Sequence, residues 1–262
     1  YSHAEGGYTI AGGVVGGKPS GNYSHAEGSR TTAIGNYSHA EGIDTTASGG
    51  TSHAEGGNTI AGGNYSHAEG YQTSAIGDYS HAEGYRTTAS GYGSHAEGYR
   101  TTAIGYYSHA EGSRTTASGH YSHSGGKGFN INNKIIASGE TSFVHFKQTS
   151  ASGIIGSYGD YSAILGGNDH NIGTGSTSSG IFAGSGNTIS DDVLRTVVLG
   201  GGNITGSTND TVYVPNLNIV MSYTPSSSGD TIGNVGAITW DDTYIYVKTN
   251  SGWGRSLLGY TF

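Results

Sequence analysis

Histidine and glutamate lie two positions apart in the pentapeptide Ser-His-Ala-Glu-Gly, which occurs eight times between Ser2 and Gly112. Imidazole and carboxylate groups could act as an acid–base pair or as ligands of a divalent metal ion. An enzyme needs one pocket in which unlike groups converge, whereas here the same pair recurs in every copy. The repetition favours a structural ladder. We therefore expect no catalytic residues, no metal and no cofactor.

The pentapeptides recur regularly along the chain. From Ser24 to a degenerate copy at Ser122 they keep a constant 14-residue spacing, and only the step from Ser2 to Ser24 is longer, because of an insertion around Val14–Gly21. A second element, Thr-x-Ala-x-Gly, lies between the pentapeptides, as at Thr31–Gly35. Both elements alternate with period two and end in glycine, which is typical of strands and bends and unfavourable for helices. Two short strands in each repeat, stacked coil upon coil at strand spacing, predict a β-solenoid.

The alternation also assigns side chains to faces. Thr and Ala of the second element, and Ser and Ala of the first, are small and nearly constant, which suits the narrow inside of a coil. The histidines and glutamates then share the outer face of the first strand. A core of Ala, Ser and Thr buries little apolar area. We therefore expect the stack of coils to need lateral partners.

The 14-residue spacing, the Ser-x-Ala-x-Gly strand and the second x-Ala-x-Gly strand resemble the head repeats of trimeric autotransporter adhesins over residues 1–125. The resemblance implies a left-handed parallel β-roll and a homotrimer. The family carries Val and Ile where this chain has His and Glu, and the resemblance implies that these positions face the other subunits. The predicted trimer-seam ladder consists of His25, Glu27, His39, Glu41, His53, Glu55, His67, Glu69, His81, Glu83, His95, Glu97, His109 and Glu111.

Stacked glutamates repel one another unless their carboxylates accept hydrogen bonds. We expect cross-chain His–Glu pairs in every layer, which would raise the pKa of the histidines toward the physiological range. Two alternatives remain open. The two columns could simply face solvent, or occasional ions could lie on the trimer axis.

Beyond residue 125 the pattern changes. An insertion at Gly125–Lys134 precedes Ala137-Ser-Gly, and Ala151-Ser-Gly follows at the spacing of the regular repeat. From Ser162 a related repeat with a longer step begins, and it recurs at Ser179 and Thr196. It places Leu165, Phe182 and Leu199 on the former His/Glu face, which predicts an apolar clamp that holds the oligomer together.

The end of the chain has a different character. Thr211–Ile219 indicates a strand that leaves the roll, and Thr224–Asp230 has the composition of a flexible linker. Gly236–Leu258 is predicted to form a small β-meander and resembles the terminal segment of phage fibre and virion structural proteins. We predict four parts, which are an all-β roll at 1–125, transition coils at 126–161, a 17-residue-repeat clamp at 162–222, and linker and meander at 223–262.

Arginine and tyrosine follow the glycine bend in several copies. Such side chains, when exposed, contact saccharides or proteins, although a solvated face of long side chains explains the same pattern. The candidate surface residues are Arg30, Tyr71, Tyr85, Arg86, Tyr99, Arg100 and Arg114.

Composition limits the classes of function. Eleven Lys and Arg against 19 Asp and Glu give a net charge of −8, which disfavours nucleic acid as a partner. No apolar run approaches the ~20 residues of a membrane span, so no membrane insertion is expected. There is no cysteine, and the lone Met221 indicates a processed chain or a fragment.

These observations predict a structural and adhesive trimeric fibre on a virion surface, such as a phage tail or decoration fibre. Such an extracellular rod would attach to a host-surface protein or glycan. The head of a bacterial trimeric surface adhesin is the alternative. An ice-binding β-solenoid, suggested by the threonine columns, is a third possibility, although only one Thr per coil points outward.

Overall fold

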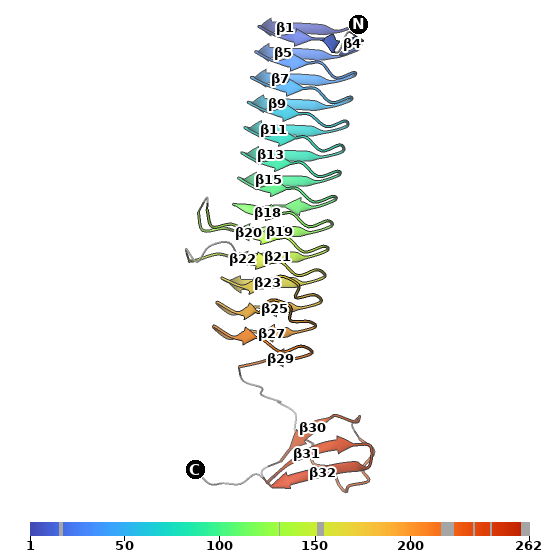
Figure 1. Cartoon of the computed structure of the whole chain (residues 1–262), viewed down its shortest axis with the longest axis vertical. Helices are drawn as coiled ribbons and strands as arrows, with labels where there is room; N and C mark the ends of the chain where they lie inside the picture. The colour runs from blue at the N-terminus through green and yellow to red at the C-terminus, as the bar shows by residue number, and fades with distance from the viewer. Residues whose placement is uncertain are drawn as a thin grey trace. The chain divides into compact units, whose positions relative to one another are not determined.

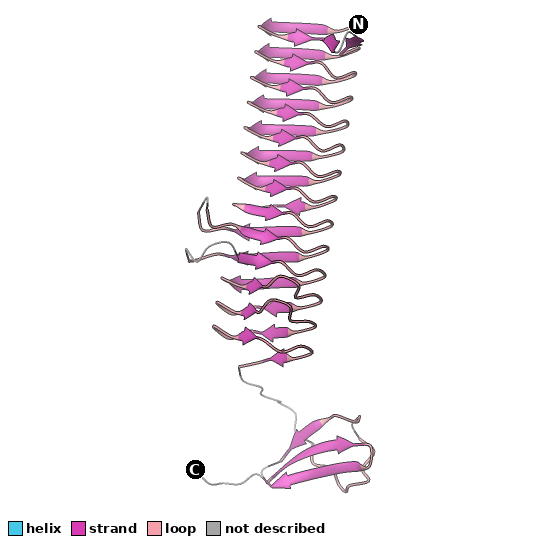
Figure 2. Cartoon of the chain, viewed as in Figure 1, coloured by secondary structure: helices cyan, strands magenta, loops and turns pink. Residues whose placement is uncertain are grey.

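The computed structural model describes residues 1–15, 18–130, 132–150, 155–215, 223–232, 234–241 and 243–257. The chain divides into two compact units, Tyr1–Pro215 and Asn216–Phe262. The first unit is a parallel β-solenoid in which each coil gives one strand to each of two sheets (Figure 1). Throughout the described residues the chain consists of strands and loops, without a helix (Figure 2).

The first sheet of the roll has 14 strands in chain order, all parallel. It contains the Ser-His-Ala-Glu-Gly segments and their counterparts in the later coils. Its strands are β1 (His3–Gly7), β5 (His25–Ser29), β7 (His39–Ile43), β9 (His53–Gly57), β11 (His67–Tyr71), β13 (His81–Tyr85), β15 (His95–Tyr99), β17 (His109–Ala110), β19 (His123–Lys127), β21 (Phe143–Lys147), β23 (Ala163–Asn168), β25 (Gly180–Phe182), β27 (Val197–Leu199) and β29 (Val212–Tyr213).

The second sheet has 13 parallel strands built from the Thr-x-Ala segments and their counterparts. Its strands are β2 (Ile10–Ala11), β6 (Thr32–Ala33), β8 (Thr46–Ala47), β10 (Ile60–Ala61), β12 (Ser74–Ala75), β14 (Thr88–Ala89), β16 (Thr102–Ala103), β18 (Thr115–Ala117), β20 (Ile135–Ala137), β22 (Ile155–Ser157), β24 (Asn171–Ile172), β26 (Thr188–Ile189) and β28 (Thr205–Gly206).

Equivalent residues of successive coils pair directly, as the repeat predicts. His67 pairs with His81 and Glu69 with Glu83, and the same register runs through the regular coils. The longer first step keeps this register, because His3 pairs with His25. At the insertion, β3 (Gly13–Val15) pairs antiparallel with β4 (Lys18–Ser20).

The inside of the regular coils is filled by small side chains. Ala26 and Thr31 are fully buried, Ser24 is nearly so, and their counterparts behave in the same way down to Ala117. Most of the serine hydroxyls donate a hydrogen bond to the carbonyl of the glycine that ends the preceding strand, as Ser80 does to Gly77 at 2.6 Å. Most of the buried threonine hydroxyls have no such partner among the described residues. The predicted inward faces are confirmed.

The two glycines of each repeat are needed for different reasons. Gly28 has a φ of 113°, the positive value expected at a bend. The second glycine, represented by Gly35, lies outside the positive-φ region. It is required by close approach instead, because a Cβ there would lie 1.9 Å from the Gly49 carbonyl oxygen of the next coil. The positive φ near this second bend is taken by Tyr37 (59°).

The two coils after the regular region are longer than the regular ones, the first as its predicted insertion requires and the second contrary to the prediction. His123 pairs with Phe143 and Phe143 with Ala163, so both of these steps exceed the regular spacing. On the second sheet Ala137 pairs with Ser157. The prediction that Ala151 is the next counterpart of Ala137 is therefore wrong, and Ala151–Gly153 lie outside the described residues. A loop between the two sheets can lengthen at small entropic cost while the strands keep their register.

From β23 onward the predicted second repeat is present, since Ala163 pairs with Gly180 and Gly180 with Val197. The core of these coils is aliphatic, with Ile164, Ile181 and Val198 fully buried where the regular coils have alanine. Val212 and Tyr213 pair with β27 and thus continue the first sheet. The predicted departure of a strand at Thr211 is wrong for these two residues, and 216–219 lie outside the described residues.

The second unit contains an antiparallel sheet of β30 (Ile238–Trp240), β31 (Tyr244–Thr249) and β32 (Gly252–Leu257), as predicted for the C-terminal meander. The segment predicted to be a flexible linker is instead held against this sheet. The Asp230 carboxylate accepts a hydrogen bond from the Ser226 amide at 2.9 Å, and the Trp253 amide donates to the Ser228 carbonyl at 2.8 Å.

Candidate functional site

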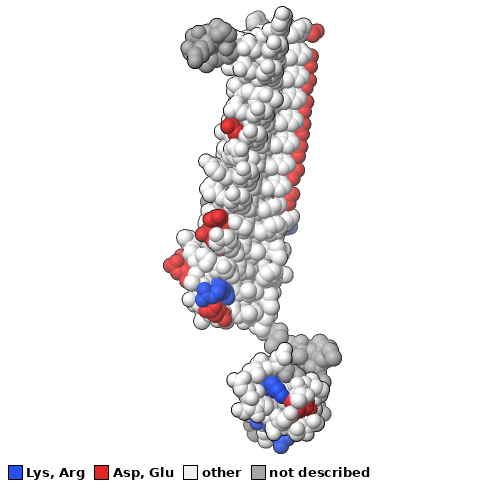
Figure 3. Space-filling model, turned by 90° about the vertical axis from the view of Figure 1, so that its right-hand side faces the viewer, with Lys and Arg blue, Asp and Glu red and all other residues white. Residues whose placement is uncertain are grey.

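The histidines and glutamates of the regular coils form two parallel columns on the outer face of the first sheet. From His25 to His109 the imidazole rings stack with centroids 4.8–4.9 Å apart and nearly parallel planes. The glutamates form a continuous line along one side of the roll (Figure 3). Both columns are half-buried in the single chain. The structure thus places every predicted seam residue on one face.

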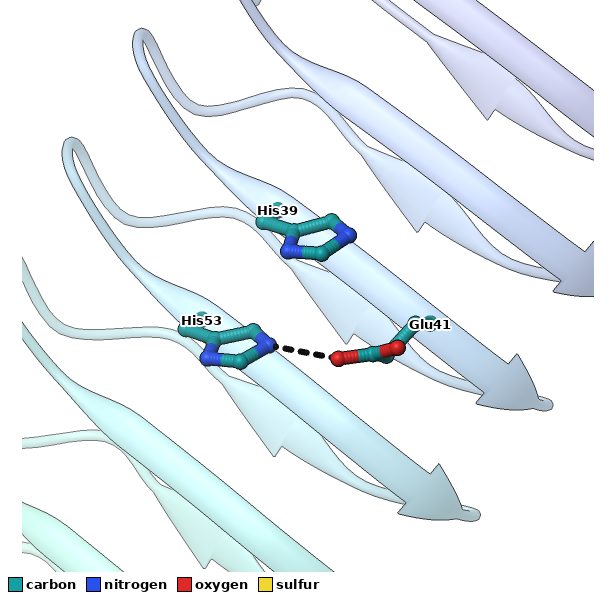
Figure 4. Close-up of side chains that lie close together, drawn as sticks. All are labelled: His39, Glu41 and His53. Atoms are coloured by element: carbon teal, nitrogen blue, oxygen red, sulfur yellow. Dashed lines mark hydrogen bonds and ion pairs between the residues drawn. The ribbon is translucent and has the colours of Figure 1, made fainter.

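Each glutamate lies beside the histidine of the following coil. Glu41 Oε1 is 3.1 Å from His53 Nε2, and its carboxylate points toward that ring (Figure 4). The Glu97–His109 contact has the same length, and Glu111 lies 3.2 Å from His123. Other layers are looser, with Glu27–His39 and Glu83–His95 at 3.8 Å. Pairing between neighbouring coils of one chain therefore exists, whereas the cross-chain pairs remain a prediction.

The pKa values of three central histidines of the ladder move in the direction opposite to the prediction. Burial lowers the pKa of His67, His81 and His95, and the positive charge of neighbouring imidazoles lowers it further. The facing carboxylates act in the opposite direction but do not outweigh these effects. A stack of imidazoles disfavours adding a proton to any one of them. These three histidines are therefore held neutral.

The glutamates share protons along their column. The hydrogen bond with Glu69, followed by burial, raises the pKa of Glu83 to about 7. The hydrogen bond with Glu69 likewise raises the pKa of Glu55, whereas hydrogen bonds from Glu83 and Glu55 lower the pKa of Glu69. Adjacent carboxylates that cannot all ionise behave in this way. In the centre of the column the pKa values of successive glutamates thus shift in alternating directions.

Several groups on this face have the donor set of a divalent metal site. His39, Glu41 and His53 form one group, and Glu111, His123 and His145 form another, with the three ligand atoms of each group within 4.8 Å of one another. Imidazole and carboxylate suit zinc or a similar ion. These side chains already contact one another, as the His–Glu distances show. Our expectation that the chain needs no metal remains a prediction.

The same face becomes apolar below the last pentapeptide. The register leads from Gly125 to His145 and on to Leu165, Phe182 and Leu199 in the column that began with glutamate. These three apolar side chains are 43%, 37% and 44% exposed in the single chain. The predicted clamp residues therefore lie together and continue the His/Glu face.

The predicted surface stripe forms in part. Tyr71, Tyr85 and Tyr99 stack with centroids 5.5 and 5.2 Å apart, and the Arg86 guanidinium lies 5.4 Å from the Tyr85 ring centre. Arg100 and Arg114 similarly lie 5.4 and 5.1 Å from the Tyr99 ring. Arg30 is separate from these rings and forms an ion pair with Asp44.

Sequence reasoning missed three residues of these surfaces. His123 and His145 both contact the Glu111 carboxylate, so they continue the His–Glu contacts beyond the last glutamate of the ladder. Lys134 lines the same groove as Arg86, Arg100 and Arg114. The signal for Lys134 was present, because Lys134–Ala137 matches the pattern of Arg114–Ala117 across the insertion.

Comparison with protein-family models matches the YadA head domain repeat (2 copies) at residues 20–38, 40–66, 68–94 and 96–122. The regular roll is similar to the YadA head. All four YadA head-like segments lie in the coils that carry the His/Glu face. No curated protein matches the chain. In the part of the chain that the structure describes, no helix has the length and apolar character needed to cross a bilayer.

The match bears on the two resemblances differently. It supports the resemblance of the roll to adhesin head repeats. It gives no support to the resemblance of the C-terminal meander to phage fibre proteins, because the matched segments all lie before residue 123. The adhesin alternative therefore fits better than the virion-fibre prediction, and an extracellular, surface-exposed location fits the YadA head-like repeats.

Proposed function

We propose that this chain is the head-type rod of a homotrimeric bacterial surface adhesin, in which the outer face of the first sheet forms the seam between subunits. The rod would be extracellular and would hold an adhesive surface away from the cell. The YadA head-like repeats support this reading, because heads of that type are trimeric in general.

One observation carries the proposal, namely that a single face is continuous from the His/Glu columns to Leu165, Phe182 and Leu199. Exposed apolar side chains that line up on one sheet face mark an interface. A homotrimer would cover them with the same face of two further copies. The His/Glu columns of the regular coils would then meet around the same three-fold axis and make hydrogen bonds between chains.

The proposal assigns the roll no catalytic step. The same His–Glu contact recurs between several coils, and such repetition supports a role in assembly. Nucleic acid is not a proposed partner, because the net charge of −8 opposes phosphate binding.

The test is the mass of the protein in solution. Light scattering of the purified chain should give three times the 26.7 kDa of one chain. The triple variant Leu165→Asp/Phe182→Asp/Leu199→Asp should dissociate, because three charges per chain would be buried at the seam. The double variant Ile76→Asp/Ile104→Asp is the matched control, since these exposed side chains lie beside second-sheet strands, away from the seam. A monomeric parent, or equal dissociation of both variants, would overturn the proposal.

A further inference from the structure

One column of residues follows the bend between the two sheets, and each member has a positive φ. Its upper part is neutralised within the chain, because Arg30 pairs with Asp44 of the next coil at 2.5 Å. Asn58 and Gln72 then occupy the column. Below them come Arg86, Arg100 and Arg114 in three consecutive coils.

Lys134 adds a fourth cation. Ile135 pairs with Thr115 of the preceding coil. Lys134, the residue before Ile135, is therefore the counterpart of Arg114 in the next coil. Arg86, Arg100, Arg114, Lys134 and Thr102 line one groove of about 240 Å³, which we call the arginine groove. With coils at the strand spacing of about 4.8 Å, four cations span roughly 14 Å. No carboxylate is among the lining residues.

None of the four cations has an ion pair within the described part of the chain, whose arginine ion pairs are Arg30–Asp44 and Arg195–Asp210. Arg86 donates to Gln72 Oε1 at 2.5 Å, and Arg114 donates only to the Ser113 hydroxyl at 3.3 Å. Within the described residues, the buried Nε atoms of Arg100 and Arg114 have no acceptor. Like charges at neighbouring positions of a parallel ladder repel, whereas Arg30 of the same column has an aspartate one coil away. Among the described residues no such carboxylate pairs with the four cations, so an anion from outside the chain would stabilise them.

Tyrosine rings fix these guanidinium groups in place. Arg86 lies over Tyr85, and Arg100 and Arg114 lie over Tyr99, which restricts the arginines to one side of the bend. Tyr71 extends the stack, and more than a third of each of the three rings is exposed. The ring faces are covered by one another and by the guanidinium groups, so the tyrosines hold the row of cations in a fixed geometry.

We propose that the arginine groove binds a short segment of a linear sulfated polysaccharide, with sulfate groups on the guanidinium groups and Lys134. Guanidinium groups bind tetrahedral oxyanions through paired hydrogen bonds. The site is short, and the chain as a whole carries −8, so it suits a few anionic groups better than an extended nucleic-acid backbone. The inference rests on the proposed function, because it names the ligand class of an adhesive surface.

The experiment measures binding of a short heparin oligosaccharide to the full chain by calorimetry at low and at near-physiological salt. We expect binding of the parent that weakens with salt, and no binding of chemically desulfated heparin. Arg100→Gln/Arg114→Gln should raise the Kd by about tenfold or more. Arg195→Gln, the control at an ion-paired arginine of the other bend of the coil, should change the Kd less than about twofold.

Two additional variants keep the test informative if the double variant folds poorly. Arg100→Lys/Arg114→Lys keeps both charges and should retain most of the salt-dependent binding. Lys134→Gln, outside the strands, should weaken binding by about threefold. Failure of the parent to bind heparin, equal binding of desulfated heparin, or equal affinity for single-stranded DNA would overturn the assignment.

The outcome is separable from that of the proposed function. A trimeric parent that ignores heparin would contradict only the arginine groove. A chain that binds heparin but is monomeric by light scattering would contradict only the proposed assembly.

Discussion

At the scale of single residues, the His/Glu face is defined by how its protons are distributed. Stacked imidazoles have lowered pKa values because burial and neighbouring histidines disfavour their charged form. The pKa values of Glu55 and Glu83 are raised because the hydrogen-bonded Glu69 is only one coil away. Below about pH 7 a proton on Glu83 removes one negative charge from the centre of the column, which makes burial of this face between subunits less costly.

Glu83→Gln tests this distribution of protons. The pKa of Glu83 is raised from 4.5 to about 7 in the folded chain, so below pH 4.5 the side chain is protonated in both states. As pH rises from 4.5 through 7 the unfolded chain loses the proton first, and the parent loses stability that the neutral Gln variant keeps. We expect equal melting temperatures at the acid end of this range and an advantage of the variant above pH 7 of about 1 kcal/mol, discounted for solvent screening of a third-exposed side chain.

Thermal melting at a series of pH values gives this difference directly. Glu140→Gln, at an exposed residue outside the ladder, is the control and should show no pH-dependent difference from the parent. A difference for Glu83→Gln that is constant across pH would contradict proton sharing between Glu69 and Glu83.

At the scale of elements, the bends decide how closely the coils stack. Gly70 has a φ of 106°, and a Cβ on it would lie 2.2 Å from the Gly84 carbonyl oxygen. That oxygen belongs to the backbone of the next coil, so it can move only if the ladder opens. Gly57 also lies in a regular coil, but a Cβ there would meet only the Tyr71 ring, at 3.1 Å. Ile43 occupies the same register position one coil earlier.

Gly70→Ala should therefore lower the free energy of unfolding by about 3 kcal/mol, from backbone strain and the separation of two coils. Gly57→Ala should change it by less than about 1 kcal/mol, because a flexible side chain can give way. Denaturant titrations of both variants provide the comparison. Similar losses for the two alanines would show that the bends do not set the stacking distance.

The regular coils could be predicted because each face follows from period-two alternation, and a slip of one residue would put His67 inside. The first longer step after His123 was signalled by its insertion, whereas the second could not be predicted in the same way. Ladder register depends on the strands, and Ser157 pairs with Ala137 although the sequence pattern points to Ala151. The histidine pKa values depend on desolvation by stacked neighbours, which residue types alone do not reveal. Lys134 was missed because an insertion separates it from the pattern it continues.

At the scale of the whole roll, each regular coil contacts mainly the coils before and after it. Repeat proteins of this kind have stabilities that add up from units and their interfaces. In this chain two cores follow one another, alanine in the regular coils and isoleucine or valine in the later ones. The later coils bury more apolar surface per residue and should be the more stable part of the roll.

Deleting one complete coil, His67–Ser80, should leave the register intact, because Ser66 would then precede His81 as it now precedes His67. We expect an unchanged circular dichroism spectrum per residue and a melting temperature within a few degrees of the parent. Deleting only His67–Thr73 removes half a coil and exchanges the two sheets for every later residue, so this control should not fold. Equal damage from both deletions would contradict a roll of interchangeable coils.

The alanine, serine and threonine core of the regular coils has a thermal consequence. Unfolding this region exposes little apolar surface, and apolar exposure is what makes the heat capacity of unfolding positive. The heat capacity increment per residue should thus lie below the ~12–15 cal/mol/K of ordinary domains. A small heat capacity increment flattens the dependence of the free energy of unfolding on temperature. The regular coils should therefore tolerate both warming and chilling.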